Sequence, residues 1–514
     1  MSLTVFIPTA GIGSRLEDFT KNYNKSLLPF QNKPLISHLI DKFSSSTEFV
    51  IALGHKGHLV KQYLEICYPQ KKIKFVKIDN YNKKGSGLGY TLYKSKKYLQ
   101  KPFLFCPCDG LFEKININKN KNNIFFKSKL NNGNYRYIEL NKKKISIREK
   151  KKTKEKVKLY TGICFIKDFK KFWKYADLKN KSFVTIGESF PINKMIHDGS
   201  KFEINRVEWN DFGNIKEYEK KNKNLRILHK NNETIYFVNK KVIKFNTDVN
   251  FIKDRVKRAK KLLPYVPIIE NNTNNFYSYK MVKGQVFSDC INEMNFKKLL
   301  NYCKDFWSIK KLSVIKSKKF QKECFSFYKT KTEKRVSEYL KKNNNFDKFK
   351  KINFQKVEKV KILLKKVSWN KICNGTCSRF HGDLHFENIL KTKKGFKFLD
   401  WRQNFNNEKI YGDIYYDLAK IMHGIYVSHK EVYENNFKVL TKQNKVRIFI
   451  KRNKKLKIIE KLFKNWIKKN GYDLKKVMIL TGLIFLNISP LHHYPYNNFL
   501  FLLGKKMLSE TCNS

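Results

Sequence analysis

The first 110 residues show two alternating hydrophobic patterns. Four short apolar runs predict buried strands over residues 3–10, 48–54, 72–78 and 102–109. Between them, PLISHLIDKF (34–43) and HLVKQYLEICY (58–68) carry apolar residues at helical spacing. Strands that alternate with helices favour a mainly parallel sheet covered on both faces. We therefore expect an α/β domain with a Rossmann-like, three-layer architecture at the N-terminus.

The pattern changes after residue 215. The polar segment KEYEKKNKN (216–224) lacks apolar periodicity and predicts a linker. Short alternating runs then predict antiparallel strands over 225–230, 234–239 and 241–245. Helical patterns dominate the rest, broken by a hairpin-like stretch around FKFLDW (396–401). We expect two domains, residues 1–218 and 219–514, and find no convincing internal repeat.

Composition limits the class of protein. A chain of 514 residues can form more than one core, and 41% hydrophobic residues argue against disorder throughout. The 109 basic and 43 acidic residues give a formal net charge of +66. The lysines are spread along the whole chain together with many Asn and Ile residues, a pattern that favours a solvated surface over a dedicated polyanion site. We expect no specific nucleic-acid partner, and polyanion binding is the alternative that the charge suggests.

Targeting signals are not recognisable. MSLTVFIPTAG has no basic region followed by an apolar region and a cleavage site. The apolar run VMILTGLIFL (477–486) is too short to span a bilayer and predicts a core helix, so we expect no transmembrane segment. The ten cysteines show no paired zinc spacing, and Cys106 and Cys108 lie within a predicted strand. These features predict a reduced, cytoplasmic chain, and they leave the oligomeric state open.

A glycine-rich turn follows the first predicted strand. In AGIGSRL, Gly11 and Gly13 would let the backbone amides approach phosphate oxygens, and Arg15 adds a cation. The longer run GIGSRLEDFTKNYNKSLLPFQNKPLI resembles the signature of sugar-phosphate nucleotidyltransferases, within the MobA-like nucleotidyltransferase superfamily. The residues that fit its pattern are Gly11, Gly13, Ser14, Arg15, Leu16, Thr20, Lys25, Leu27, Pro29, Lys33, Pro34 and Ile36. The resemblance implies that Gly11, Gly13, Ser14 and Arg15 hold a triphosphate and that Lys25 acts at the reacting phosphates.

Later features match the same family. The GSGLG stretch, with Gly85 and Gly87, falls where the family has a loop near the base, although alone it also suits an ordinary turn. The resemblance places Asp109, in CPCDG, and Asp211, in VEWNDFGN, as two Mg²⁺ ligands. Mg²⁺ held there would neutralise the triphosphate while a sugar or alcohol phosphate attacks the α-phosphorus. Lys150 follows Glu149 without the proline of the family's E-K-P, so its expected contact with the acceptor phosphate leaves the acceptor open.

A second phosphate motif lies late in the chain. HGDLHFENIL (381–390) has the spacing of a kinase catalytic loop, in which Asp383 would accept the proton of a substrate hydroxyl. Asn388 would help to hold Mg²⁺, and Asp400, at the end of the strand in FKFLDW, would hold it against the β- and γ-phosphates. The three polar residues together favour a kinase-like site over a set of capped turns.

The sequence after this loop indicates which kind of kinase. YGDIYYDLAKIM (411–422) resembles the G-D-x-x-x-D-L-A pattern of the aminoglycoside phosphotransferase and choline kinase family. That resemblance implies a protein-kinase-like, two-lobed α+β domain that acts on small hydroxyl compounds, with Asp413 and Asp417 as structural supports. KKVIKF resembles the kinase V-A-I-K strand and makes Lys244 the expected contact to the ATP phosphates, with Asp254 as its acidic partner. FYSYKMVKG (276–284) would be the hinge.

These observations predict a bifunctional enzyme. The second domain would phosphorylate a sugar or polyol with ATP and Mg²⁺, and the first would join that phosphate to a nucleotide from CTP, UTP or GTP for cell-surface glycan synthesis. Arg402 would repel a quaternary ammonium group, but a choline kinase joined to a phosphocholine cytidylyltransferase stays an alternative. Another alternative is a non-catalytic nucleotide-binding regulator, and an antibiotic-modifying phosphotransferase would not need the first domain.

Overall fold

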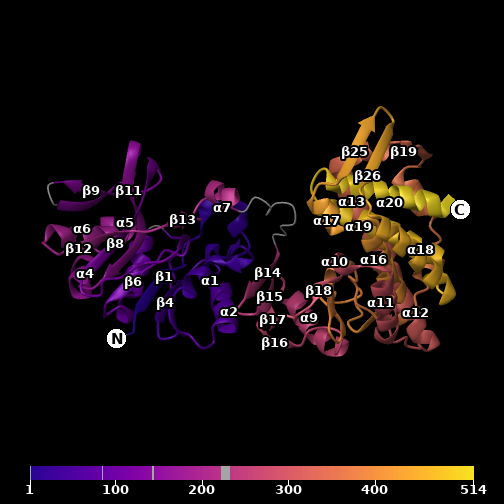
Figure 1. Ribbon diagram of the computed structural model, residues 1–514, viewed down its shortest axis with the longest axis horizontal. Coiled ribbons are helices and arrows are strands. Elements are labelled where there is room, and N and C mark those ends of the chain that lie inside the picture. Colours follow the sequence, from indigo (N-terminus) through magenta and orange to yellow (C-terminus); the bar gives the residue numbers. More distant parts are fainter. Residues whose placement is uncertain (1, 84, 142–143, 222–231, 514) are drawn as a thin grey trace. The chain divides into compact units, whose positions relative to one another are not determined.

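The computed structural model describes residues 2–83, 85–141, 144–221 and 232–513, and Figure 1 traces them from indigo at the N-terminus to yellow at the C-terminus. The chain divides into two compact units. The first contains residues Met1–Asp248 and Asn271–Ser278, and the second contains Val249–Glu270 and Tyr279–Ser514.

The first unit is built on a nine-stranded mixed sheet. Its order is β10-β9-β11-β6-β1-β4-β5, with β8 beside β11 and β12 beside β8. The strands are β1 (Thr4–Pro8), β4 (Glu48–Leu53), β5 (Lys72–Lys77), β6 (Phe103–Phe105), β8 (Asn122–Asn132), β9 (Tyr137–Asn141), β10 (Lys144–Arg148), β11 (Lys152–Ile166) and β12 (Phe202–Arg206). The four predicted strands are confirmed as β1, β4, β5 and β6, and they run parallel. The expectation of a mainly parallel sheet is wrong beyond β6, because β9, β10 and β11 follow one another without crossover helices and pair antiparallel.

Helices cover both faces of this sheet. Alternate residues of β1 face opposite sides: Val5 and Ile7 pack in one hydrophobic cluster and Phe6 in another. The first cluster includes α1 (Leu35–Ile40) and α2 (Gly57–Cys67). The second includes α3 (Leu88–Lys94), α4 (Phe169–Tyr175), α5 (Lys181–Ile186) and α6 (Ser189–His197). The predicted three-layer architecture of the N-terminal domain is therefore confirmed.

Short elements complete the first unit around the ends of these strands. They are η1 (Ser14–Thr20), η2 (Lys25–Leu27), β2 (Pro29–Phe30), β3 (Lys33–Pro34), η3 (Lys96–Tyr98), β7 (Gly110–Phe112), β13 (Trp209–Asp211) and α7 (Ile215–Lys221). Residues 216–221, predicted as a linker, instead belong to helix α7. Tyr218 is buried and donates a 2.8 Å hydrogen bond to the carbonyl of Pro29, which anchors a helix without apolar periodicity. The rest of the predicted linker and the strand expected over 225–230 lie outside the described residues.

The hairpin of β14 (Glu233–Val238) and β15 (Lys241–Asn246) matches the prediction of antiparallel strands. With β16 (Ile269–Asn272) and β17 (Phe276–Lys280) it forms a sheet of order β14-β15-β17-β16. The hydroxyl of Tyr236 donates to the carbonyl of Leu27 at 2.8 Å, and its ring lies 5.6 Å from that of Tyr63. Because these side chains join the first core, the compact units divide after Asp248, later in the chain than the predicted boundary at 218.

The second unit is mainly helical. Its helices are α9 (Val249–Leu262), α10 (Phe287–Cys290), α11 (Glu293–Phe306), α12 (Val314–Phe325), η4 (Ser326–Thr330), α13 (Lys331–Asn343), η5 (Asn344–Lys348), α14 (Val360–Lys366), α15 (Trp369–Cys373), η6 (Phe386–Asn388), α16 (Ile414–Tyr426), α17 (His429–Tyr433), α18 (Lys454–Lys469), α19 (Leu474–Ile488), η7 (Ser489–Leu491) and α20 (Tyr496–Asn513). Its strands are β18 (Gln285–Val286), β19 (Lys351–Ile352), β20 (Gln355–Lys356), β21 (Cys377–Arg379), β22 (Ile389–Thr392), β23 (Gly395–Phe398), β24 (Tyr411–Asp413), β25 (Phe437–Lys442) and β26 (Lys445–Ile450). The antiparallel β22–β23 hairpin matches the hairpin-like stretch predicted just before Asp400.

Helix α19 forms part of the core of the second unit, as predicted for residues 477–486. Among the described residues, Leu474–Leu491 is the one helical stretch with the length and hydropathy of a membrane span, and 61% of it is buried. Burial of this kind is also a property of core helices in soluble proteins. All ten cysteines are free thiols.

Candidate active sites

In the first unit, strand pairing brings the two predicted metal ligands together. Strand β7 pairs antiparallel with β13 so that Asp211 lies opposite Gly110, and the amide of Phe212 donates to the carbonyl of Asp109 at 2.8 Å. A Cβ atom on Gly213 would lie 2.8 Å from Oδ2 of Asp109 and 3.0 Å from Oδ1 of Asp211. The two carboxylates therefore converge on one point, and glycine leaves that point open.

Two cations face these carboxylates. Nζ of Lys25 lies 2.9 Å from Oδ2 of Asp109. A guanidinium nitrogen of Arg15 lies 3.4 Å from the position that a Cβ atom on Gly213 would take. Burial alone would raise the pKa of Asp109, but the charges of Lys25 and Arg15 lower it. Burial lowers the pKa of Lys25, but Asp109 outweighs this effect and raises it. The ion pair is therefore charged.

Asp211 differs from Asp109. Burial, followed by the negative charge of Asp109, raises the pKa of Asp211. A second carboxylate that is costly to ionise beside the first would be stabilised by an added divalent cation. Carboxylate oxygens are ligands that Mg²⁺ prefers, so the residues present fit the predicted metal.

Tyr135 also belongs to this site, although no sequence pattern indicates it. Its hydroxyl donates a 2.8 Å hydrogen bond to Oδ2 of Asp211, and its ring packs edge-on against Trp209 at 5.6 Å. The amide of Gly213 donates to the other oxygen, Oδ1, at 2.8 Å. Burial and the charge of Asp211 raise the pKa of Tyr135, so its hydroxyl stays a donor. Asp211 is therefore oriented before any ligand binds.

The glycine turn lies against Lys25. Gly13 has φ of +74°, and a Cβ there would come within 3.1 Å of Thr20 and 3.4 Å of the Cβ of Lys25. No atom lies within 4 Å of a Cβ added to Gly11, and Ser14, the first residue of η1, is exposed. The predicted phosphate-binding turn therefore leaves space at Gly11 next to the ion pair of Lys25.

The remaining predicted contacts of the first unit are more dispersed. A Cβ on Gly87 would lie 2.2 Å from the carbonyl oxygen of Val184, so Gly87 permits close packing of α3 on α5. Gly85 has φ of +85° and open space around it. Lys150 is exposed between β10 and β11 and forms no hydrogen bond or ion pair with the residues that the structure describes, whereas Glu149 lies 3.7 Å from Arg136.

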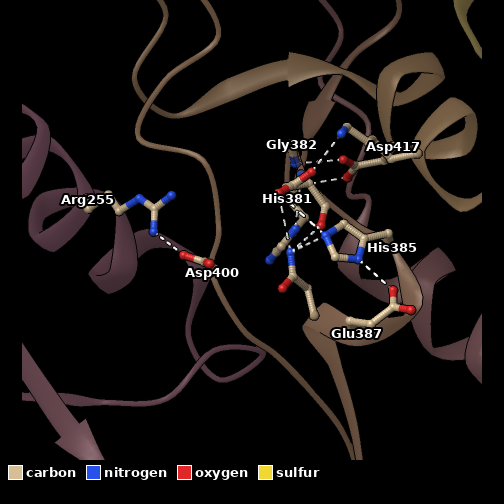
Figure 2. A network of polar contacts seen from close by, with 10 residues as sticks. Arg255, His381, Gly382, His385, Glu387, Asp400 and Asp417 are labelled. Atoms are coloured by element: carbon tan, nitrogen blue, oxygen red, sulfur yellow. Dashed lines mark hydrogen bonds and ion pairs between the residues drawn. The ribbon is translucent and has the colours of Figure 1, made fainter. Parts of the chain in front are cut away.

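In the second unit, helix α16 fixes the loop that carries Asp383. The amides of His381 and Gly382 donate to the carboxylate of Asp417 at 2.6 and 2.7 Å, as Figure 2 shows. Trp307 donates to the same carboxylate at 3.0 Å, and burial raises the pKa of Asp417 to about 6. Asp417 thus supports the loop as the sequence predicts. Asp413 caps the start of α16 through the amide of Tyr415 at 3.2 Å.

The carboxylate of Asp383 lies between two cations. Nζ of Lys420, on α16, is 2.8 Å from Oδ1 of Asp383, and Nε2 of His385 is 3.7 Å from Oδ2. Burial would raise the pKa of Asp383, but Lys420 and His385 hold it well below its usual range. Asn388 donates to the carbonyl of Asp383 at 2.9 Å. The predicted base is therefore ionised, and Asp383 and Asn388 are neighbours.

The sequence offers one signal for Lys420, a residue to which the family resemblance assigns no role. Lys420 follows Asp417 by three residues on α16, so both side chains lie on one face of the helix. Since Asp417 holds the loop, Lys420 is carried to the carboxylate of Asp383 by the same helix.

Asp400 has a different neighbour. It adopts φ of +59°, an uncommon conformation for a residue other than glycine, two residues after the end of β23. Its carboxylate forms an ion pair with Arg255 of α9, and Figure 2 shows this pair set apart from the cluster of His381, Gly382 and His385. The side chains of Asp400 and Asn388, predicted to share a metal, thus have separate partners.

Asp254 and Lys244, the two residues predicted to act on the ATP side, have different surroundings. Asp254, expected to pair with Lys244, instead forms an ion pair with Lys409 at 2.9 Å, because its side chain is partly exposed on α9. Lys244 is buried on β15, opposite Ile235, within the first unit.

His385, Glu387 and His429 form a compact cluster beside the base. Their possible ligand atoms lie within 4.8 Å of one another. Nδ1 of His385 is 2.9 Å from Oε2 of Glu387. Burial would lower the pKa of His385, but Asp383 and Glu387 raise it to about 9. A charged His385 already bound to Glu387 makes this cluster an ion pair that orients His385 toward Asp383.

Comparisons with known proteins support the resemblance of the first part of the chain to nucleotidyltransferases. No protein-family model matches the chain. The chain is 30% identical over 105 residues to the bifunctional protein GlmU of Methanococcus vannielii, which covers 20% of this chain and 24% of the relative. It is 28% identical over 158 residues to the bifunctional protein GlmU of Methanococcus maripaludis, covering 30% of this chain and 37% of the relative. The chain thus spans well under half of the length of these curated relatives.

Solved structures of nucleotidyltransferases also align with part of the chain. A CTP:phosphocholine cytidylyltransferase from Streptococcus pneumoniae is 19% identical, with a TM-score of 0.36, over 44% of this chain and 100% of that chain. An inositol-1-phosphate CTP transferase from T. maritima is 16% identical, with a TM-score of 0.34, over 43% of this chain and 96% of that chain. The curated relatives, the three-layer fold and the paired carboxylates together support a nucleotidyltransferase-type domain in the first part of the chain.

Proposed function

We propose that this chain is a bifunctional enzyme that makes a phosphate ester and then caps it with a nucleotide. Its second unit would phosphorylate a sugar or polyol with ATP, and its first unit would transfer a nucleotidyl group from a second NTP to that phosphate. The observation that supports the proposal is that each unit brings carboxylates and cations together at one place: Asp109 and Asp211 beside Lys25, and Asp383 beside Lys420.

In the nucleotidyl step, an oxygen of the acceptor phosphate attacks the α-phosphorus of the NTP, and the bond to the β-phosphate breaks to release pyrophosphate. Asp109 and Asp211 would hold Mg²⁺, which neutralises the triphosphate. Lys25 and Arg15 stabilise the charge that develops on the phosphates. Amides of the turn at Gly11, Gly13 and Ser14 would bind phosphate oxygens. Gly85 and Gly87 would lie near the base and Lys150 near the acceptor phosphate.

In the phosphoryl step, the hydroxyl oxygen of the acceptor attacks the γ-phosphorus of ATP, and ADP leaves. Asp383 accepts the hydroxyl proton, while Lys420 and His385 keep its carboxylate ionised and oriented. Asn388 and Asp400 would hold Mg²⁺, which offsets the charge of the phosphates. The second unit would then act as a kinase-like domain of the aminoglycoside phosphotransferase and choline kinase type.

The product would be a nucleotide-activated sugar or polyol of the kind used for surface glycans, made in the cytoplasm where nucleotides are available. The test uses the full chain with ATP, Mg²⁺, a panel of sugars, polyols and choline, and each NTP in turn, with products identified by mass spectrometry. Asp383→Ala should abolish ADP release and spare nucleotidyl transfer to a supplied phosphate ester. Asp109→Ala should do the reverse. Nucleotide binding without any turnover would favour a non-catalytic regulator instead.

A further inference from the structure

A cavity of about 550 Å³ lies beside the catalytic loop of the second unit. One wall is formed by η4 and the start of α13, and the other by residues 402–406, which follow Asp400. The amide of Arg402 donates to the carbonyl of His381 at 2.9 Å, and a Cβ on Gly382 would lie 2.6 Å from the Cβ of Arg402. The second wall is therefore in contact with the loop that carries Asp383.

The sequence of α13 makes the first wall basic. Lys331, Lys334, Arg335 and Glu338 recur at helical spacing and line the cavity. Residues on another face of the helix, including Val336 and Tyr339, are buried in the core. Among the described residues that line the cavity, Glu338 is the one carboxylate, and it lies 2.9 Å from Arg335. Together with Arg402, four cations and one carboxylate surround the cavity.

Two of these cations share one aromatic ring. Nζ of Lys331 lies 4.4 Å and the guanidinium carbon of Arg402 lies 4.9 Å from the centre of the Phe327 ring. Nε of Arg402 is buried without a hydrogen-bond partner among the described residues. Burial, followed by the charges of Arg402, Lys420 and Arg335, holds the pKa of Lys331 well below its usual range. Such crowding of like charge is relieved when an anion enters.

The position of Arg402 is fixed by its own loop. Glu323 on α12 accepts hydrogen bonds from Asn406 at 2.5 Å and from the amide of Asn407 at 3.1 Å. The π-helical turn η4, between α12 and α13, sets the direction of the opposite wall. Such turns occur often at functional sites. Both walls are therefore set before a ligand binds.

We propose that this cavity binds the acceptor of the phosphoryl transfer and that the acceptor is an anion, a sugar or polyol that also carries a carboxylate or phosphate group. The inference rests on the proposed kinase function of the second unit. The cations would bind the anionic group and direct a hydroxyl toward Asp383. The same cations would repel choline.

The test compares matched acceptors on the full chain with Mg²⁺: glucose, gluconate and glucose 6-phosphate, then glycerol, glycerate and glycerol 3-phosphate, and choline. Calorimetry in the presence of ADP gives affinity, and ADP release from ATP gives turnover. We expect at least one anion to bind about 10-fold or more tightly than its neutral parent, as a charge-assisted hydrogen bond would give. Comparing the acceptors that carry a carboxylate with those that carry a phosphate shows which anionic group the cavity recognises.

Lys331→Met and Arg335→Met should weaken binding of that anion by about 10-fold each. Lys342→Met, on the same helix but outside the cavity lining, is the matched control and should change nothing. The inference is overturned if no anion binds better than its parent, if choline binds best, or if the cavity variants bind like wild type. If only neutral acceptors stimulate ADP release, the proposal of an anionic acceptor is wrong, but the proposed kinase function still holds. If anions bind but no acceptor stimulates ADP release, the proposed kinase function is contradicted instead.

Discussion

Nζ of Lys420 lies 2.8 Å from Oδ1 of Asp383, although the two residues come from different elements of the second unit. Three residues before Lys420 on the same helix, Asp417 binds the amides of His381 and Gly382. One helix therefore both holds the loop and supplies the charge that keeps its base ionised. Without that charge, burial would raise the pKa of Asp383.

Lys420→Met should change the pH profile of ADP release. In the wild type the pKa of Asp383 lies well below its usual range, so the base stays ionised and activity persists as the pH falls through the mildly acidic range. Removing the cation should move the acid limb of kcat/KM upward by roughly 1–3 pH units. The measurement is kcat/KM from pH 4 to 8, with Lys342→Met as control. An unmoved acid limb would show that Asp383 does not limit the rate there.

Asp109→Asn and Asp211→Asn should each lower pyrophosphate release by roughly 100-fold or more, because metal charge stabilisation contributes several kcal/mol. ADP release by the second unit should be unchanged. EDTA should abolish both reactions, and added Mg²⁺ should restore them. Asp79→Asn, an exposed carboxylate with 64% side-chain exposure, is the control. Equal loss of both reactions in the Asp109 variant would indicate unfolding rather than loss of the site.

Tyr135→Phe should lower kcat/KM for pyrophosphate release by about 5- to 10-fold, the effect of one hydrogen bond to a carboxylate. The hydroxyl orients Asp211 at 2.8 Å, and the ring should keep its packing on Trp209. Circular dichroism and the melting temperature should therefore stay close to wild type. Asp211 also accepts hydrogen bonds from the amide of Gly213 and, at 3.2 Å, from the side chain of Asn214. Wild-type kinetics across a range of Mg²⁺ concentrations would mean that these two bonds suffice to position the carboxylate.

The parts of the sites that the sequence predicts are those with local patterns. Asp109, at a strand end, and Asp383, in a short motif, could be identified because the residues around them carry the signal. The parts that it did not predict depend on long-range pairing. Tyr135 bonds to a residue 76 positions away and Arg255 to one 145 positions away, and neither has a neighbouring motif. Side chains brought in by tertiary packing leave no periodic trace in one sequence.

The fold shows the same limit. The parallel strands β1, β4 and β6 were predictable because each is largely apolar, whereas the antiparallel strands β9 and β10 carry many polar residues. The sequence predicts a linker where helix α7 lies, because this helix is held by one buried tyrosine rather than by an apolar stripe. Periodicity detects helices only when tertiary contacts follow a repeating face.

Gly11→Ala and Gly87→Ala should separate phosphate binding from packing. A methyl group at Gly11 meets no atom within 4 Å, so the melting temperature should stay near wild type while the KM for the NTP rises. A methyl group at Gly87 would come within 2.2 Å of a backbone carbonyl of α5 and should destabilise the first unit by about 1–3 kcal/mol, as overpacking does. Urea unfolding and NTP-dependent kinetics measure the two effects. An unchanged KM in the Gly11 variant would argue against close approach of phosphate to this turn.

Arg255→Met should lower the Mg²⁺ concentration that half-saturates ADP release. Arg255 occupies the carboxylate of Asp400, which must otherwise bind the metal, so the guanidinium and Mg²⁺ compete for the same oxygens. Its backbone should stay in place, because the carbonyl of Arg255 accepts a 3.0 Å hydrogen bond from Trp401 whatever the side chain. Losing a charged hydrogen bond of about 1.5 kcal/mol corresponds to a shift of roughly 10-fold. Mg²⁺ titrations at saturating ATP, with Arg255→Lys as the charge-conserving control, measure this shift. A higher Mg²⁺ requirement in Arg255→Met would mean that the guanidinium positions Asp400 for the metal instead of competing with it.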